Sequence, residues 1–263
     1  MATTTIFADI VRSVGGDLVT VDSIVPAGAG PEDYEPKPDD ARRLAAADLI
    51  VSNGVGLDDF LGRLIDAAGA SHAARLVLGD GIPTMTVEGK ANPHFWLDPS
   101  LVEHYYLPAI QAALTELRPA SADTIATATE SYAAKLRAAD AANAATLGQI
   151  PVERRKLVTF HDAFPYFAAH YDFELIGVIL HNPGQEPSAA DLAALVRTVK
   201  AAGVTAVFSE AQFDPKLART LADEAGITKV VSNLYNDSLG PPPADSYLGL
   251  LSWDVEHVAE ALR

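Results

Sequence analysis

The chain has 263 residues, of which 49% are hydrophobic and 21% are charged, a balance typical of folded globular proteins rather than disordered ones. Its 19 Lys and Arg residues against 35 Asp and Glu residues give a net charge of −16, which repels phosphate backbones and argues against nucleic-acid binding. The absence of cysteine excludes disulfides, thiolate metal sites and cysteine nucleophiles.

The first part of the chain alternates short β-branched runs with helical stretches. This alternation predicts a mostly parallel sheet flanked by helices, whose ligand sites lie at the carboxyl ends of the strands. The predicted strands are residues 3–7, 18–26, 48–54 and 74–80, and the predicted helices between them are 8–16, 39–47 and 57–69.

The same alternation returns in the last part of the chain. It predicts a second α/β lobe, with strands at 156–160, 173–180, 204–210 and 227–233 and helices at 163–171, 188–203, 215–226 and 255–262.

Residues 120–147 separate the two alternating parts. This stretch is rich in Ala and contains no Gly or Pro, so it predicts one long helix of about 40 Å. We therefore expect an α/β protein with an N-terminal lobe at 1–118, a rigid linking helix at 119–149 and a C-terminal lobe at 150–263. An ordinary surface helix of a single domain is the alternative.

Two of the seven histidines stand where a ligand site is expected. His94 lies in a proline-bounded loop rich in aromatic residues, and His161 follows the strand 156–160 where the next helix begins. Neutral imidazole binds transition metals, and a nearby helix start lowers its proton affinity. The others are expected to be solvated or structural: His72, His104, His170, His257, and His181, which precedes a Pro-Gly turn at 183–184.

Two loops rich in Pro and Gly offer carboxylates. The first follows residues 18–26 and contains Glu32, Asp33 and Glu35, and the second follows 227–233 and contains Asp237. Proline restricts a loop and lowers the entropic cost of fixing its side chains, which suits an ion site, although solvated acidic turns have the same composition. Glu210 ends the strand 204–210 and is expected to accept a hydrogen bond near the site or to cap a helix.

Six sequence blocks identify a family resemblance. They resemble, in the same order and over nearly the whole chain, the zinc and manganese substrate-binding proteins of ABC transporters, known as cluster A-I or family 9. The resemblance implies two α/β lobes joined by a rigid helix, with one metal ion held between them. The blocks are PEDYEPKPDDARRLAAADLIVSNGVGLDDFL, NPHFWLDPSLV, TFHDAFPYFAAHY, GQEPSAADLAALVRTVK, VFSEAQFDPKLARTLADEAG and LYNDSLGPPPADSYLGLL.

The resemblance also implies the ligands. The histidine of its NPHxWLDP block is His94, and the aspartate of its DSLG block is Asp237. The ligand that follows the strand 156–160, in the block TFHDAF, is His161. The family commonly has a histidine where this chain has Glu32. Three interpretations of that position stay open: Glu32 coordinates the metal, Asp33 does so instead, or water fills the place.

The expected function is that of an extracytoplasmic binding protein that captures Zn²⁺, with Mn²⁺ or Fe²⁺ as alternatives, and delivers it to an ABC permease. We expect a monomer in the periplasm or outside the cell, free or anchored as a lipoprotein; the first residues are too short and too soon acidic for a secretory signal. We do not expect an enzyme, since HExxH, GxSxG and GxxxxGK[ST] are absent. The alternatives are a metal hydrolase with Glu210 or Glu35 as general base, and an adhesin or metal chaperone.

Overall fold

The computed structural model describes residues 1–70, 72–87, 89–181 and 187–263. The chain divides into two compact units, one formed by Met1–Ala138 with Asp237–Gly240 and the other by Ala139–Asn236 with Pro241–Arg263. Both combine parallel strands with helices, so the α/β class is confirmed. The lobe limits at 118 and 150 stay a prediction.

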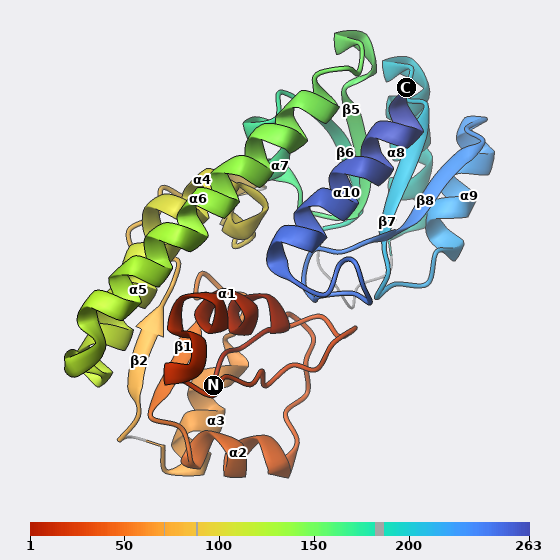
Figure 1. The fold of residues 1–263 in the computed structure, drawn as a ribbon. Helices are drawn as coiled ribbons and strands as arrows, with labels where there is room; N and C mark the ends of the chain where they lie inside the picture. Colours follow the sequence, from red (N-terminus) through yellow and green to blue (C-terminus); the bar gives the residue numbers. More distant parts are fainter. Residues whose placement is uncertain (71, 88, 182–186) are drawn as a thin grey trace. The chain divides into compact units, whose positions relative to one another are not determined.

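The first unit has a short parallel pair of strands, β1 and β2, next to an apolar core made by the helices α2 and α3 (Figure 1). Leu44, Ile50, Leu61 and Ile65 belong to this core. The elements of the unit are α1 (Thr5–Gly15), α2 (Pro38–Ala45), β1 (Leu49–Ser52), α3 (Phe60–Ala68), β2 (Ala74–Val77), β3 (Thr86–Val87), β4 (Lys90–Ala91), α4 (Pro99–Leu101), a π-helical turn (Val102–Tyr106) and α5 (Leu107–Leu117).

The strands predicted at 3–7 and 18–26 are wrong. The run of β-branched residues at the start favours a strand, but the side chain of Thr4 accepts the backbone N–H of Phe7 and caps α1, so the helix begins at Thr5. Residues 18–26 form no regular strand; their backbone pairs briefly with Ala2 and Thr3, through the bridge between Ser23 and Ala2 and hydrogen bonds from Ile24 and Val25. The local hydroxyl cap therefore outweighs the strand propensity of the first residues.

In the second unit, every strand and helix predicted from the sequence is confirmed, with shifted ends. Strands β5 and β6 pair in parallel, β7 and β8 do the same, and β5 lies next to β7. Val158, Ile179, Val207 and Leu221 belong to the core under α8 and α9. The elements are β5 (Lys156–His161), α7 (Pro165–His170), β6 (Glu174–Leu180), α8 (Ala189–Ala202), β7 (Ala206–Glu210), α9 (Lys216–Ala225), β8 (Lys229–Leu234) and α10 (Tyr247–Leu262) (Figure 1).

The long helix predicted at 120–147 is confirmed as α6 (Ala122–Leu147), which has 26 residues (Figure 1). Its first part belongs to the first unit, where Arg137 forms ion pairs of 2.6 Å with Glu103 and 2.7 Å with Glu130. Its last part belongs to the second unit, where Asp140 accepts a hydrogen bond of 2.8 Å from the hydroxyl of Tyr171. The boundary between the two units therefore falls within α6.

The histidines expected outside the site have surface or structural positions. His72, His104 and His181 are exposed, His170 pairs with Asp140 at 2.8 Å, and the ring of His257 lies on Trp253. The turn predicted at 183–184 lies outside the described residues. Across the part of the chain that the structure describes, no helix has both the length and the apolar character needed to cross a membrane.

Candidate metal centre

His94 is buried in a loop that fixes which ring nitrogen carries the proton. The side-chain oxygen of Asn92 accepts the backbone N–H of His94 at 3.1 Å and also lies 3.0 Å from Nδ1 of the same residue. An amide oxygen only accepts, so Nδ1 holds the proton and Nε2 keeps its lone pair. The ring of Trp96 lies against the imidazole, with centroids 5.2 Å apart. Nε2 is therefore the ring nitrogen of His94 that could coordinate a metal ion.

Asp237 meets this nitrogen within the first unit. Nε2 of His94 lies 3.5 Å from Oδ1 of Asp237, and both side chains are only 2% exposed. The residues that follow Asp237 hold it in place: Oγ of Ser238 accepts the backbone N–H of Gly28 at 2.8 Å, and the backbone N–H of Leu239 donates to the hydroxyl of Thr5 at 2.9 Å. Short hydrogen bonds thus attach the segment Asp237–Gly240 to the first unit.

The loop that carries Glu32 belongs to the same part of the molecule. A carboxylate oxygen of Glu32 lies within 4.8 Å of a ring nitrogen of His94, and the side chain is otherwise exposed. A Cβ atom at Gly30 would lie 3.3 Å from Oδ1 of Asp33 and 3.8 Å from Oδ2 of Asp237, so the loop backbone approaches both carboxylates. Glu32 and Asp237 thus each lie close to His94, with Asp33 on the same loop as Glu32; that these side chains bind a metal stays a prediction.

His161 is the last residue of β5 and lies in the second unit. Its Nδ1 atom is 3.2 Å from Oε1 of Glu210, the last residue of β7, and both side chains are 1% exposed. The carboxylate accepts a hydrogen bond from the Nδ1–H group, so Nε2 is the ring nitrogen that carries the lone pair, while Phe213 packs edge-on against the ring. The role of Glu210 as a hydrogen-bond acceptor is thereby confirmed.

His161 does not stand at a helix start as expected. Helix α7 begins at Pro165, after the N-cap residue Phe164, so His161 is not at its first turn. The hydrogen bond to Glu210, on the neighbouring strand, sets instead which ring nitrogen carries the proton. A helix dipole acts only within the first turn, and a hydrogen bond to a carboxylate has a shorter range and a stronger effect.

A hydrogen-bonded pair of amides faces the other nitrogen of His161. Nδ2 of Asn236 lies 3.1 Å from Nε2 of His161, and Oδ1 of Asn236 accepts the side-chain N–H of Gln212 at 2.9 Å. The Asn236 side chain is completely buried. Within the second unit, both ring nitrogens of His161 therefore have specific partners.

Asp254 of α10 is a further buried carboxyl near this cluster. Burial raises the pKa of Asp254 well above its ordinary value, the hydrogen bond of 2.9 Å from the backbone N–H of Tyr235 lowers it, and the charge of Glu210 raises it. Glu210 and Asp254 thus repel each other in a buried environment, which favours the neutral form of Asp254.

Four of these residues were not predicted from the sequence. Asn92 and Asn236 stand two residues and one residue before predicted ligands, and that proximity is the signal that could have identified them. Gln212 stands two residues after Glu210, which was expected near the site, whereas Asp254 is far from every predicted site residue in the sequence and only the packing of α10 brings it close.

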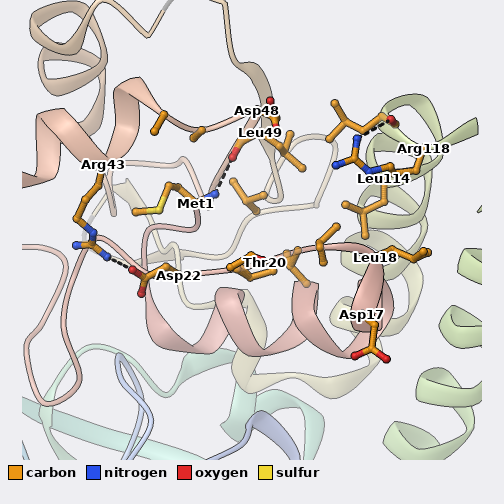
Figure 2. A pocket seen from close by; sticks show the side chains of 17 residues that line it. Met1, Asp17, Leu18, Thr20, Asp22, Arg43, Asp48, Leu49, Leu114 and Arg118 are labelled. Carbon is orange, nitrogen blue, oxygen red and sulfur yellow. Dashed lines mark hydrogen bonds and ion pairs between the residues drawn. The ribbon is translucent and has the colours of Figure 1, made fainter.

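A separate cavity of about 540 Å³ lies in the first unit, at the amino end of β1 and the carboxyl end of α5 (Figure 2). Arg43 pairs there with Asp22 at 2.5 Å, and the amino group of Met1 donates to the carbonyl of Leu49 at 2.8 Å. Burial acts to raise the pKa of Asp22, but the hydrogen bonds from Arg43 and Ser23 leave it below its ordinary value. The predicted metal ligands do not line this cavity.

Comparison with known proteins gives matches over the whole chain. Residues 1–261 match the family model described as zinc-uptake complex component A, periplasmic. The chain is 32% identical over 269 positions to the iron-binding protein YfeA of Yersinia pestis, covering 99% of this chain and 85% of that protein. It is 28% identical over 276 positions to the metal ABC transporter substrate-binding lipoprotein SloC of Streptococcus mutans, covering 100% of this chain and 89% of that protein.

Two solved structures of periplasmic metal-binding proteins are also similar to this chain over nearly their whole length. The Mn-bound periplasmic metal binding protein from Candidatus Liberibacter asiaticus is similar with a TM-score of 0.90 and 25% identity, over 100% of this chain and 98% of that one. The periplasmic zinc binding protein TroA of Treponema pallidum is similar with a TM-score of 0.90 and 27% identity, over 99% and 97% of the two chains.

Proposed function

The chain belongs to the family of periplasmic zinc-uptake complex component A proteins, and on that premise we propose that it captures a divalent transition metal outside the cytoplasm and delivers it to an ABC permease. The family consists of substrate-binding proteins of transporters, as the sequence resemblance implied. Metal is therefore the cargo of the protein.

The proposed ligands are Glu32, His94 and Asp237 of the first unit and His161 of the second. The contact between His94 and Asp237 is the observation that supports them most. With metal bonds of about 2.1 Å and a tetrahedral angle, two ligand atoms of one zinc ion stand about 3.4 Å apart. Nε2 of His94 and Oδ1 of Asp237 are 3.5 Å apart, which fits two ligands of the same ion.

The hydrogen bonds behind the histidines support the same proposal. A metal-binding histidine commonly donates its other ring N–H to a carboxylate or a carbonyl oxygen, which fixes the tautomer and orients the ring. The side-chain oxygen of Asn92 accepts such a hydrogen bond from His94, and the carboxylate of Glu210 accepts one from His161.

We propose Zn²⁺ as the principal cargo. Two imidazole nitrogens and two carboxylate oxygens suit four-coordinate zinc, whereas a carboxylate-rich site with bidentate binding also accepts Mn²⁺ or Fe²⁺. Glu32 in place of a third imidazole adds one negative charge, which shifts the metal preference of the site toward the harder ions Mn²⁺ and Fe²⁺. Competition between zinc and manganese measures this preference.

A hydrolase with Glu210 as general base receives no support. The side chain of Glu210 is completely buried and accepts a hydrogen bond from His161, so Glu210 is not placed to activate water. We therefore propose a binding protein without catalytic activity, acting as a monomer.

A thermal melt with chelator and then with added zinc tests the proposal. At a thousandfold excess of zinc over Kd, binding stabilises the folded protein by about 4 kcal/mol, which raises Tm by on the order of 10 °C. His161→Ala is expected to lose the shift, and His72→Ala, at an exposed histidine, is expected to keep it. A parent protein whose Tm responds to neither chelator nor zinc would overturn the proposal.

A further inference from the structure

The Nε2 lone pair of His161 has two competing uses. Nδ1 of the ring donates to Glu210, so Nε2 is the nitrogen that a metal ion would bind. The same lone pair accepts a hydrogen bond of 3.1 Å from Nδ2 of Asn236. One lone pair serves either a donor N–H or a metal ion, so metal binding through this atom requires that the hydrogen bond from Asn236 be given up.

Neighbouring contacts fix the orientation of the Asn236 amide. Its Oδ1 accepts an N–H from Gln212 at 2.9 Å, which leaves its NH₂ group directed at His161. Turning the amide over would place its oxygen against the Nε2 lone pair and its NH₂ against the Gln212 donor, both of which are repulsive. Complete burial of Asn236 increases the cost of losing these hydrogen bonds.

We propose that Asn236 sets the metal affinity of this site by competing with the ion for Nε2 of His161. The inference rests on the proposed function and adds a residue that tunes it. When the metal leaves, Asn236 satisfies the freed nitrogen, so the hydrogen bond opposes capture and favours release. A transport protein requires such a balance, because it must give up its cargo to the permease.

The test compares the parent with Asn236→Ala and Asn236→Leu in competition titrations with Zn²⁺ and with Mn²⁺. Both variants lack the donor, and Leu retains most of the volume. Loss of one competing hydrogen bond is expected to lower Kd by about three- to tenfold. The fold-change is expected to be the same for both metals, since the competition concerns a ligand nitrogen common to both.

Gln212→Ala provides a second, milder variant. It removes the hydrogen bond that orients the amide but keeps the Asn236 donor, so Kd is expected to fall in the same direction but less than in Asn236→Ala. Asn233→Ala is the matched control, because Asn233 lies on β8 and its hydrogen bond from Trp253 goes to the backbone carbonyl, which the substitution leaves in place. Its Kd is expected to equal that of the parent.

Nitrogen NMR of the full chain reads the hydrogen bond directly. A coupling between Nδ2 of Asn236 and Nε2 of His161 is expected in chelator-treated protein and is expected to disappear when zinc is added. A coupling that persists in the zinc-loaded protein, or a Kd in Asn236→Ala that is unchanged or higher, overturns the inference. The parent titration keeps the two claims distinct: a parent that binds neither metal overturns the proposed function, whereas a binding parent with unaltered variants overturns only the role of Asn236.

Discussion

Oε1 of Glu210 lies 3.2 Å from Nδ1 of His161, so the last residues of β7 and β5 meet through one buried hydrogen bond. The carboxyl ends of these neighbouring strands therefore hold the ring in one tautomer. The position of the pair agrees with the rule that open α/β sheets bind ligands at the carboxyl ends of their strands.

Glu210→Gln is expected to raise the Kd for zinc by about 10- to 100-fold, since loss of a carboxylate behind a metal-binding histidine has an effect of this size. The amide keeps the shape of the side chain but removes its charge, so the imidazole becomes a weaker ligand. Competition titration against a zinc chelator measures the change. Glu174→Gln, at an exposed residue of β6, is the matched control and is expected to leave Kd unaltered.

Asn92→Ala is expected to weaken zinc binding by about tenfold or more, because the ring of His94 loses the acceptor that fixes its tautomer. Asn92→Asp restores an acceptor at the same place and is expected to recover most of the affinity. Isothermal titration of the three proteins measures both effects. Equal affinities for Asn92→Ala and the parent would contradict the assigned role of Asn92.

Separate substitutions at Glu32 and Asp33 distinguish the three interpretations of the first ligand. If Glu32 coordinates the metal, Glu32→Ala raises Kd by about 100-fold and Asp33→Ala changes it less than about threefold, since removal of a charged ligand costs several kcal/mol. Glu32→His is expected to bind zinc at least as tightly as the parent and manganese more weakly, because imidazole suits zinc and carboxylate suits manganese. The reverse order of the two alanine variants would assign the position to Asp33, and unaltered affinity in both would assign it to water.

Asp254→Asn tests the buried carboxyl by its effect on stability against pH. Burial raises the pKa of Asp254, so the folded protein holds this proton more tightly than the unfolded chain, where aspartate titrates near about 3.9. The resulting stabilisation is fully present below that pH and is lost as pH rises through the folded-state pKa. The asparagine variant cannot ionise and is expected to lose less stability as pH rises.

Urea unfolding of the chelator-treated proteins between pH 4.5 and 8 measures this difference. The gap in unfolding free energy between Asp254→Asn and the parent is expected to widen toward pH 8. Asp245→Asn, at an exposed aspartate, is the control and is expected to follow the parent. A gap that widens toward acid would contradict the raised pKa.

The order of strands and helices in the second unit could be predicted because β-branched runs and amphipathic stretches alternate there with clear Gly and Pro boundaries. The beginning of the chain could not. There the same residue type, threonine, favours a strand by its shape but caps a helix by its hydroxyl, and Thr4 follows the second preference.

The candidate site could be predicted only in part. His94, His161 and Asp237 stand in blocks that resemble those of a metal-binding family, whereas Asn92, Asn236 and Gln212 are uncharged amides common in any loop or turn. Their hydrogen bonds arise only when distant strands and loops come together. Side chains that orient a ligand are therefore harder to predict than the ligands.

The most direct test of the central claim is a crystal structure of the zinc-loaded protein with anomalous diffraction at the zinc edge. The account predicts one zinc ion per chain, bonded to Nε2 of His94, Nε2 of His161 and carboxylate oxygens of Glu32 and Asp237, at about 2.0–2.2 Å. An ion bound without both histidines, or a chain that holds no zinc at this site, would contradict it.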